Sequence, residues 1–215
     1  MQIHIEMLLT KLFKYVFAIS SKYRIDESHG LQHSMNTLYY ANQIFKTELL
    51  TKPHIQSHER IIYVSAVLHD MCDKKYVNKE QQLQHIEHFL GESLPLTEIK
   101  TVQKIISTMP YSYIKQHGFP DLCEHQDAYN IVREADLLTA YDFDRSMLYH
   151  LHTKPNFTLQ EAYMSAEDFF VNRAFKHNDD CLFTTKYAKE KSKLLHEESH
   201  ERMIFWKEFV CKEME

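Results

Sequence analysis

The stretch that decides the fold is IIYVSAVLHD, residues 61–70, in which an unbroken apolar run ends in an imidazole next to a carboxylate. Apolar side chains such as Val67 and Leu68 belong in a core. His69 and Asp70 do not, because burying an ionised carboxylate without a partner is strongly unfavourable. A divalent cation is one natural partner, since imidazole and carboxylate are both good metal ligands. The alternative is structural: His69 caps a helix end and Asp70 opens a turn.

The β-branched content of this run is compatible with a buried strand, but its length and its neighbours favour a helix from Glu59 to about Asp70. The 215 residues include only 3 Gly and 5 Pro, so long helices and short loops are expected. We therefore predict an all-α fold. The length suits one domain spanning residues 1–215, with a core of about residues 20–150 and C-terminal helices, about residues 151–215, packed on it.

The net charge, the cysteines and the hydropathy of the chain limit its possible partners and its location in the cell. The net charge is −5 and no basic block stands out, so a nucleic-acid polymer is not expected as a partner. Four widely separated cysteines form no CxxC pair and indicate reduced thiols in a cytoplasmic protein. The apolar segment Leu8–Ile19 carries Lys11 and Lys14 and is too short to cross a bilayer, so it predicts an amphipathic packing helix and neither a signal peptide nor a membrane anchor.

Helical spacing of apolar residues recurs along the rest of the chain. After a first helix that ends near Lys22, the pattern predicts helices over about residues 31–50, 79–90, 97–108, 127–141, 158–172 and 185–212, with residues 142–151 as a possible continuation of the helix over residues 127–141. Residues 51–57, 71–78 and 111–125 are predicted as loops or connectors, and the last is long enough to be a functional lid.

Two of these helices hold a metal-type ligand in apolar surroundings. His33 lies in the first turn of the helix over residues 31–50, and Asp136 lies inside the apolar frame of the helix over residues 127–141. Taken alone, His33 could be an ordinary surface histidine, and Asp136 could be a core aspartate whose hydrogen bonds are satisfied. Together with His69 and Asp70 they give the order H, HD, D. Four such ligands in a helical bundle would hold one divalent cation and leave positions for water and a substrate oxygen.

In these residues and their order, the chain resembles the HD-domain superfamily of metal-dependent phosphohydrolases. The resemblance rests on HGLQH at residues 29–33, AVLHD at 66–70 and READLL at 133–138, which match the family's opening, central and closing motifs. It extends to a bacterial-type subgroup through DKKY at residues 73–76, through Arg145 after the closing aspartate, and through TKYAK at residues 185–189. The resemblance spans nearly the whole chain.

The resemblance implies an HD-domain helical bundle with a C-terminal helical extension that hydrolyses nucleoside triphosphates or other small phosphate esters. The expected cofactor is one divalent cation, Mn²⁺ first, with Mg²⁺, Ni²⁺, Co²⁺, Zn²⁺ and Fe²⁺ as alternatives. The expected partner is a small phosphorylated, nucleotide-like substrate, and a homodimer is left open. One departure matters: the family often closes with DADrLda, whereas this chain has Glu134-Ala135-Asp136. The substrate preference therefore cannot be carried over.

Roles for the residues around the four ligands follow from their chemistry. Asp73, three residues beyond Asp70, is close enough for the two carboxylates to act on the attacking water or the leaving oxygen, although a capping role for Asp73 is equally well supported. His29 either supports His33 or binds substrate.

The cations near the motifs are candidates for binding phosphate. Arg145 could hold two phosphate oxygens at once, and Lys74 and Lys75 could hold others, although solvated surface lysines are the commoner case. Glu134 is expected on a helix face other than that of Asp136 and is not predicted as a ligand.

His85 and His88 raise the question of a second metal, but we interpret both as surface residues and Cys72 as an inert buried thiol. Two alternatives to hydrolysis remain: a nucleotide-binding sensor without turnover, and an HD-type diiron oxygenase, which would require further histidine ligands.

Overall fold

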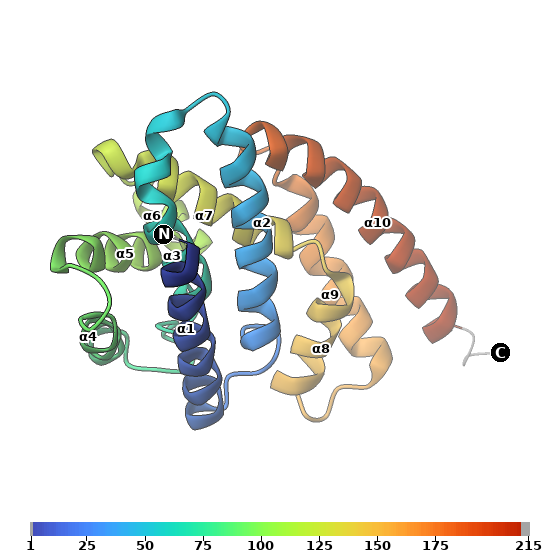
Figure 1. Cartoon of the computed structure of the whole chain (residues 1–215). Coiled ribbons are helices and arrows are strands. Elements are labelled where there is room, and N and C mark those ends of the chain that lie inside the picture. The colour runs from blue at the N-terminus through green and yellow to red at the C-terminus, as the bar shows by residue number, and fades with distance from the viewer. Residues whose placement is uncertain (1, 212–215) are drawn as a thin grey trace.

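The computed structural model describes residues 2–211, and in that range it contains helices but no strand (Figure 1). The α-helices are α1 Gln2–Tyr23, α2 Leu31–Leu49, α3 Glu59–Leu68, α4 Lys79–Leu90, α5 Leu96–Thr108, α6 Tyr111–His117, α7 Gln126–Thr139, α8 Phe143–Thr153, α9 Leu159–Asn172 and α10 Lys186–Cys211. Three short 3-10 helices join them: η1 Pro53–His58, η2 Cys123–His125 and η3 Ala174–Lys176. The predicted all-α fold class is confirmed.

Helix α2 stands at the centre of the bundle and packs against α3 and α7, which also pack against each other (Figure 1). Helix α1 covers α2 and α3, and α5 packs on α3. The stretch at residues 61–68 forms the last two turns of α3, and Ile62, Val64 and Val67 are completely buried. An unbroken apolar run is what such a helix needs, because it is covered by neighbours on several faces.

A smaller apolar cluster lies between α8, α9 and α10. It is formed by residues of all three helices and of η3, including Phe143, Met147, Phe170, Ala174 and Met203. Phe143 and Phe170 meet edge to face with their ring centroids 5.1 Å apart, a favourable geometry for aromatic rings. This cluster fixes the position of α8, whose N-terminal end faces the first turn of α2.

A buried carboxylate fastens the start of α10 to α7. Glu134 has no exposed surface, and its two oxygens accept four hydrogen bonds of 2.6–3.0 Å from the backbone and hydroxyl groups of Thr184 and Thr185. Neighbouring Arg133 donates to the carbonyl of Leu182 at 2.8 Å and lies 3.3 Å from Glu134. Thr185 in turn accepts from the amide of Ala188 and so caps α10.

The prediction of one long loop over residues 111–125 was wrong, because residues 111–117 form the short helix α6. Pro110 ends α5 and directly precedes α6, and Gly118 ends α6 with a positive φ of 76°. No residue of α6 is buried, so the helix leaves no apolar period in the sequence. Most of the predicted loop over residues 51–57 belongs to η1, which ends at His58, and α8 is a separate helix capped by Asp142. Of the predicted last helix, Lys212 lies outside the described residues.

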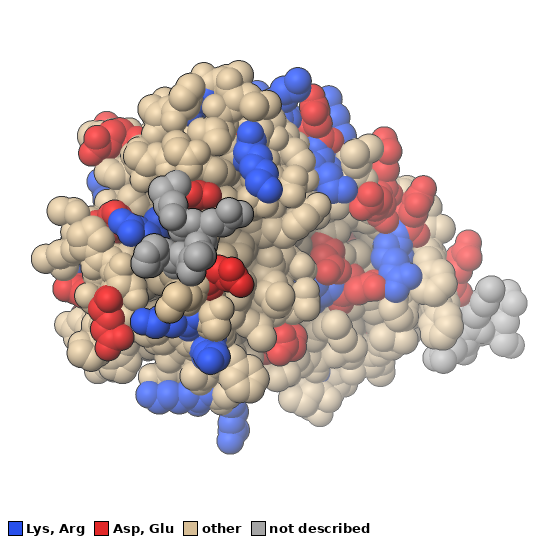
Figure 2. All heavy atoms as spheres, in the orientation of Figure 1, with Lys and Arg blue, Asp and Glu red and all other residues tan. Residues whose placement is uncertain are grey.

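Positive and negative side chains alternate over the face of the molecule seen in Figure 2. In the part of the chain that the structure describes, no helix is both long enough and apolar enough to span a membrane.

Replacing Glu134 with Ala should lower the free energy of unfolding by about 3–5 kcal/mol, because two buried donors on Thr185, two part-buried donors on Thr184 and the buried Arg133 guanidinium would lose an acceptor. Urea denaturation followed by circular dichroism measures this. The control is Glu124→Ala, at a glutamate whose side chain is 80% exposed, which should change stability by less than about 0.5 kcal/mol. Equal stabilities for the two variants would contradict the role of Glu134 in fastening the start of α10 to α7.

Candidate metal centre

Four side chains from three helices converge where α2, α3 and α7 meet. His33 comes from the first turn of α2, His69 and Asp70 follow the last turn of α3, and Asp136 comes from α7. Both imidazoles are buried, whereas 33% of the Asp136 side chain is exposed, so solvent reaches the cluster from the side of Asp136. His33, His69 and Asp136 each place one ligand atom within 4.8 Å of the others and could hold a metal ion.

The separations within the cluster suit one small cation. The Nε2 atoms of His33 and His69 are 2.9 Å apart, and Oδ2 of Asp70 lies 3.1 Å and 3.3 Å from them. Oδ1 of Asp136 lies 3.4 Å from each imidazole. Ligands about 2.1 Å from one ion are about 3.0 Å apart at right angles and about 3.4 Å apart at tetrahedral angles.

Two details of the donor set support this fit. Nδ1 of His69 lies 2.9 Å from the carbonyl oxygen of Ala66, and since a carbonyl only accepts, Nδ1 carries the hydrogen and Nε2 faces the cluster. Oδ2 of Asp70 is buried and makes no hydrogen bond, although it lies close to both imidazoles. A buried carboxylate oxygen without a donor is the kind of atom that a bound cation satisfies.

The two carboxylates of the cluster favour a nearby positive charge. Burial alone would lower the pKa of His69, but the charges of the nearby Asp70 and Asp136 raise it well above its ordinary value. Burial opposes the ionisation of both carboxyl groups, yet the charge of His69 and the nearby imidazole of His33 hold their pKa values well below the usual range. The two carboxylates therefore stay ionised and need a cationic partner.

His29 lies beside the cluster and is held by a buried network. Its ring centroid is 6.1 Å from that of His33, and its Nδ1 is 2.7 Å from the Ser28 hydroxyl and 3.3 Å from the Tyr76 hydroxyl. Asp26 accepts from the backbone and hydroxyl of Ser28 and, at 2.6 Å, from Tyr76. Burial opposes ionisation of Asp26, but the nearby His29 imidazole and the hydrogen bonds from Ser28 and Tyr76 keep its pKa well below the usual range.

Arg145 touches a member of the cluster directly. Its Nη1 donates to the backbone carbonyl of Ser28 at 3.0 Å and makes a short contact with Nδ1 of His33. Its position follows from the start of α8, where the Asp142 side chain accepts from the amide of Arg145 as the N-cap. A fixed guanidinium therefore lies at the edge of the cluster on the His33 side.

The connector after α3 places Asp73 one turn beyond Asp70. Oδ1 of Asp73 accepts from the Lys75 amide at 2.9 Å, and Oδ2 lies 3.9 Å from the Lys75 ammonium, so this side chain stabilises the turn. Lys75 also lies over the ring of Tyr149, with its ammonium 5.5 Å from the centroid. Lys74 is exposed.

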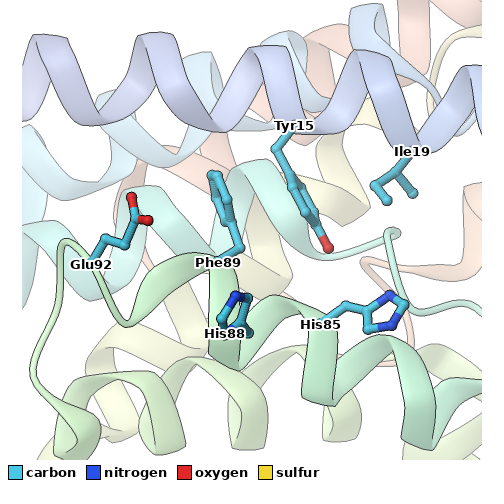
Figure 3. A pocket seen from close by; sticks show the side chains of 6 residues that line it. All are labelled: Tyr15, Ile19, His85, His88, Phe89 and Glu92. Atoms are coloured by element: carbon cyan, nitrogen blue, oxygen red, sulfur yellow. The ribbon is translucent and has the colours of Figure 1, made fainter.

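Other candidates lie outside the cluster. His85 and His88 are exposed and line a hollow of about 390 Å³ between α1 and α4, where Tyr15 stacks on Phe89 (Figure 3). A second hollow, of about 790 Å³, is lined by α1, η1 and the first turn of α3. Cys72 is buried, and burial raises the pKa of its thiol to about 12, as expected for an unreactive cysteine. Both carboxylate oxygens of Glu134 already accept hydrogen bonds from Thr184 and Thr185.

Sequence reasoning missed two ionisable residues, Arg173 and His177, whose pKa values are influenced by Asp136. The guanidinium of Arg173 lies over the rings of Tyr111 and Phe169, 4.3 Å and 5.4 Å from their centroids, and burial lowers its pKa while Asp136 raises it. His177 is 1% exposed, and neither of its ring nitrogens has a hydrogen-bond partner. Both lie in or beside η3, where no periodic pattern marks them.

Comparison with known proteins supports the fold. No family model and no curated protein matches the chain. The crystal structure of a structural genomics target from Lactobacillus plantarum is similar to it, with a TM-score of 0.71 and 20% sequence identity over 97% of this chain and 98% of that chain. At this identity the similarity shows the shared arrangement of helices and nothing about activity.

His177 predicts a pH dependence of stability. Burial and the charge of Arg173 lower its pKa to about 4, against a weaker opposing effect of Asp136, whereas the unfolded chain has the ordinary value of about 6.5. Between these values the unfolded chain binds more protons, so stability is lost as the pH falls. From pH 7 to pH 5 the loss should be about 2 kcal/mol from this residue alone.

Urea denaturation in the presence of EDTA at both pH values measures the loss without interference from bound metal. The variant His177→Gln should lose about 2 kcal/mol less than the wild type between pH 7 and pH 5. The same loss in both proteins would show that His177 is not held in its neutral form.

Proposed function

We propose that the protein is a metal-dependent phosphohydrolase of the HD-domain type that cleaves a phosphate ester or anhydride bond in a small nucleotide-like substrate. The observation that carries the proposal is the meeting of two imidazoles and two carboxylates in a solvent-reachable cluster, with His29 and Arg145 at its edge. The order of these residues along the chain is the order on which the resemblance to the HD domain rests.

In this proposal His33, His69, Asp70 and Asp136 hold one divalent cation. A bound divalent cation lowers the pKa of a water molecule and polarises a phosphoryl oxygen, which is the chemistry that hydrolysis of a phosphate ester requires. The chain's own residues supply the rest. Asp73 orients or deprotonates the attacking water, and it can do so because it follows the cluster by one turn without being needed as a ligand.

The substrate phosphates are held by cations at the edge of the cluster. Arg145 is fixed beside His33 and can bind two oxygens of one phosphate. Lys75 is exposed, and the neighbouring Asp73 carboxylate oxygen is 3.9 Å away, so its ammonium is available for a second phosphate oxygen. His29 is close enough to the cluster to move a proton to or from the substrate, with Ser28 and Tyr76 holding its ring in place.

The sensor without turnover is distinguished from the hydrolase by activity alone, since both would bind the ligand. The diiron oxygenase would need a second set of ligands, and His85 and His88 do not belong to the cluster. No observation favours either alternative over hydrolysis.

The test is a screen of nucleotides and simple phosphate esters with Mn²⁺, Mg²⁺, Ni²⁺ or Co²⁺, with phosphate and pyrophosphate measured separately. We expect metal-dependent release of one of them. The variant Asp73→Asn should keep its metal but lose about 10²–10⁴-fold in kcat with a smaller change in KM. The asparagine oxygen can still accept from the Lys75 amide, so the turn is retained while the basic group is lost.

Asp180→Asn is the matched control, because Asp180 is an exposed aspartate outside the cluster. Near-full kcat in Asp73→Asn would restrict Asp73 to its role in the turn. Binding of nucleotides without any metal-dependent release would favour the sensor.

A further inference from the structure

The face of α8 that carries Arg145 also carries Tyr149, one turn further along. Residues four apart on a helix lie on the same side, and Arg145 points at Ser28 and His33. Tyr149 is half-buried, and its ring lies edge to face with His29, with the centroids 5.5 Å apart and the planes at 63°. The ring of His29 therefore neighbours both the ring of His33, at 6.1 Å between centroids, and the ring of Tyr149, at 5.5 Å.

The surroundings of Tyr149 combine aromatic rings and one cation. Tyr76 lies on another side of His29, with centroids 5.8 Å apart, and its hydroxyl is tied to Asp26. Lys75 lies over the Tyr149 ring. The Lys75 ammonium covers one face of this ring, but its side chain is half exposed and long, so it can move from the ring to a phosphate oxygen and leave that face to a ligand. Together these residues form the outer wall of the cluster.

This arrangement matches the two ends of a nucleotide. Its phosphates would be held at the cluster by Arg145 and Lys75, and its base lies one sugar further away. At that distance the wall offers the ring of Tyr149, and aromatic side chains bind bases of any kind by stacking. A phosphate compound without an aromatic ring would gain no binding affinity from the ring of Tyr149.

We propose that Tyr149 is the stacking surface for the base of the substrate and makes the site select nucleotides over phosphate compounds that lack an aromatic ring. The inference rests on the proposed function and adds to it the residue that determines specificity. Tyr149 needs no hydroxyl for this role, since only its ring face is used.

The test uses two ligands that differ only in the base: adenosine 5′-monophosphate and ribose 5-phosphate. Isothermal titration calorimetry on the Mn²⁺-loaded full chain gives the dissociation constant of each. For wild type we expect the nucleotide to bind about tenfold tighter or more, since stacking of one base contributes about 1–3 kcal/mol. Tyr149→Ala should remove this difference and leave the binding of ribose 5-phosphate unchanged, whereas Tyr149→Phe should retain it.

Tyr39→Ala is the control, because Tyr39 is a tyrosine on α2 whose side chain is 55% exposed and has no contact with the cluster; it should bind both ligands as the wild type does. Equal affinity of the wild type for the two ligands, or an equal loss for both in Tyr149→Ala, would overturn the inference while leaving hydrolysis intact. Failure of the wild type to bind either ligand, together with no activity in the nucleotide screen, would overturn the proposed function as well.

Discussion

Two ionised carboxylates held against two buried imidazoles are the constraint on which this structure depends. Asp70 and Asp136 lie 3.1–3.4 Å from His33 and His69, and an interior position is unfavourable for such charges unless positive charge offsets them. In the chain without metal, a proton on His69 supplies part of that charge. A divalent cation would supply more, and the C-terminal end of α3, whose carbonyl groups point toward His69 and Asp70, favours a cation there.

The helices are arranged so that each ligand is held by a buried element. Helix α7 carries Asp136 into the cluster and, two residues earlier, uses Glu134 to fasten the start of α10. The cluster between α8, α9 and α10 fixes α8, whose first turn places Arg145 against His33. The C-terminal helices therefore support one wall of the site in addition to covering the core.

Much of this arrangement could be predicted from particular residues. The apolar run at residues 61–68 indicated a helix buried on several faces, and its abrupt end at His69 and Asp70 pointed to a polar centre next to the core. The helix over residues 111–117 could not be predicted, because it buries no side chain and so has no apolar period. The anchoring role of Glu134, and the positions of Arg173 and His177 near Asp136, depend on contacts between segments far apart in the sequence, which no local pattern records.

The most direct test of the account is the metal content of the purified protein and of three variants, measured by mass spectrometry after loading with Mn²⁺ and removal of the excess. The account predicts one cation per chain in the wild type and in Asp180→Ala, a control at an exposed aspartate, and little or none in Asp70→Ala and Asp136→Ala. Equal metal content in all four proteins would contradict the claim that His33, His69, Asp70 and Asp136 together form a metal centre.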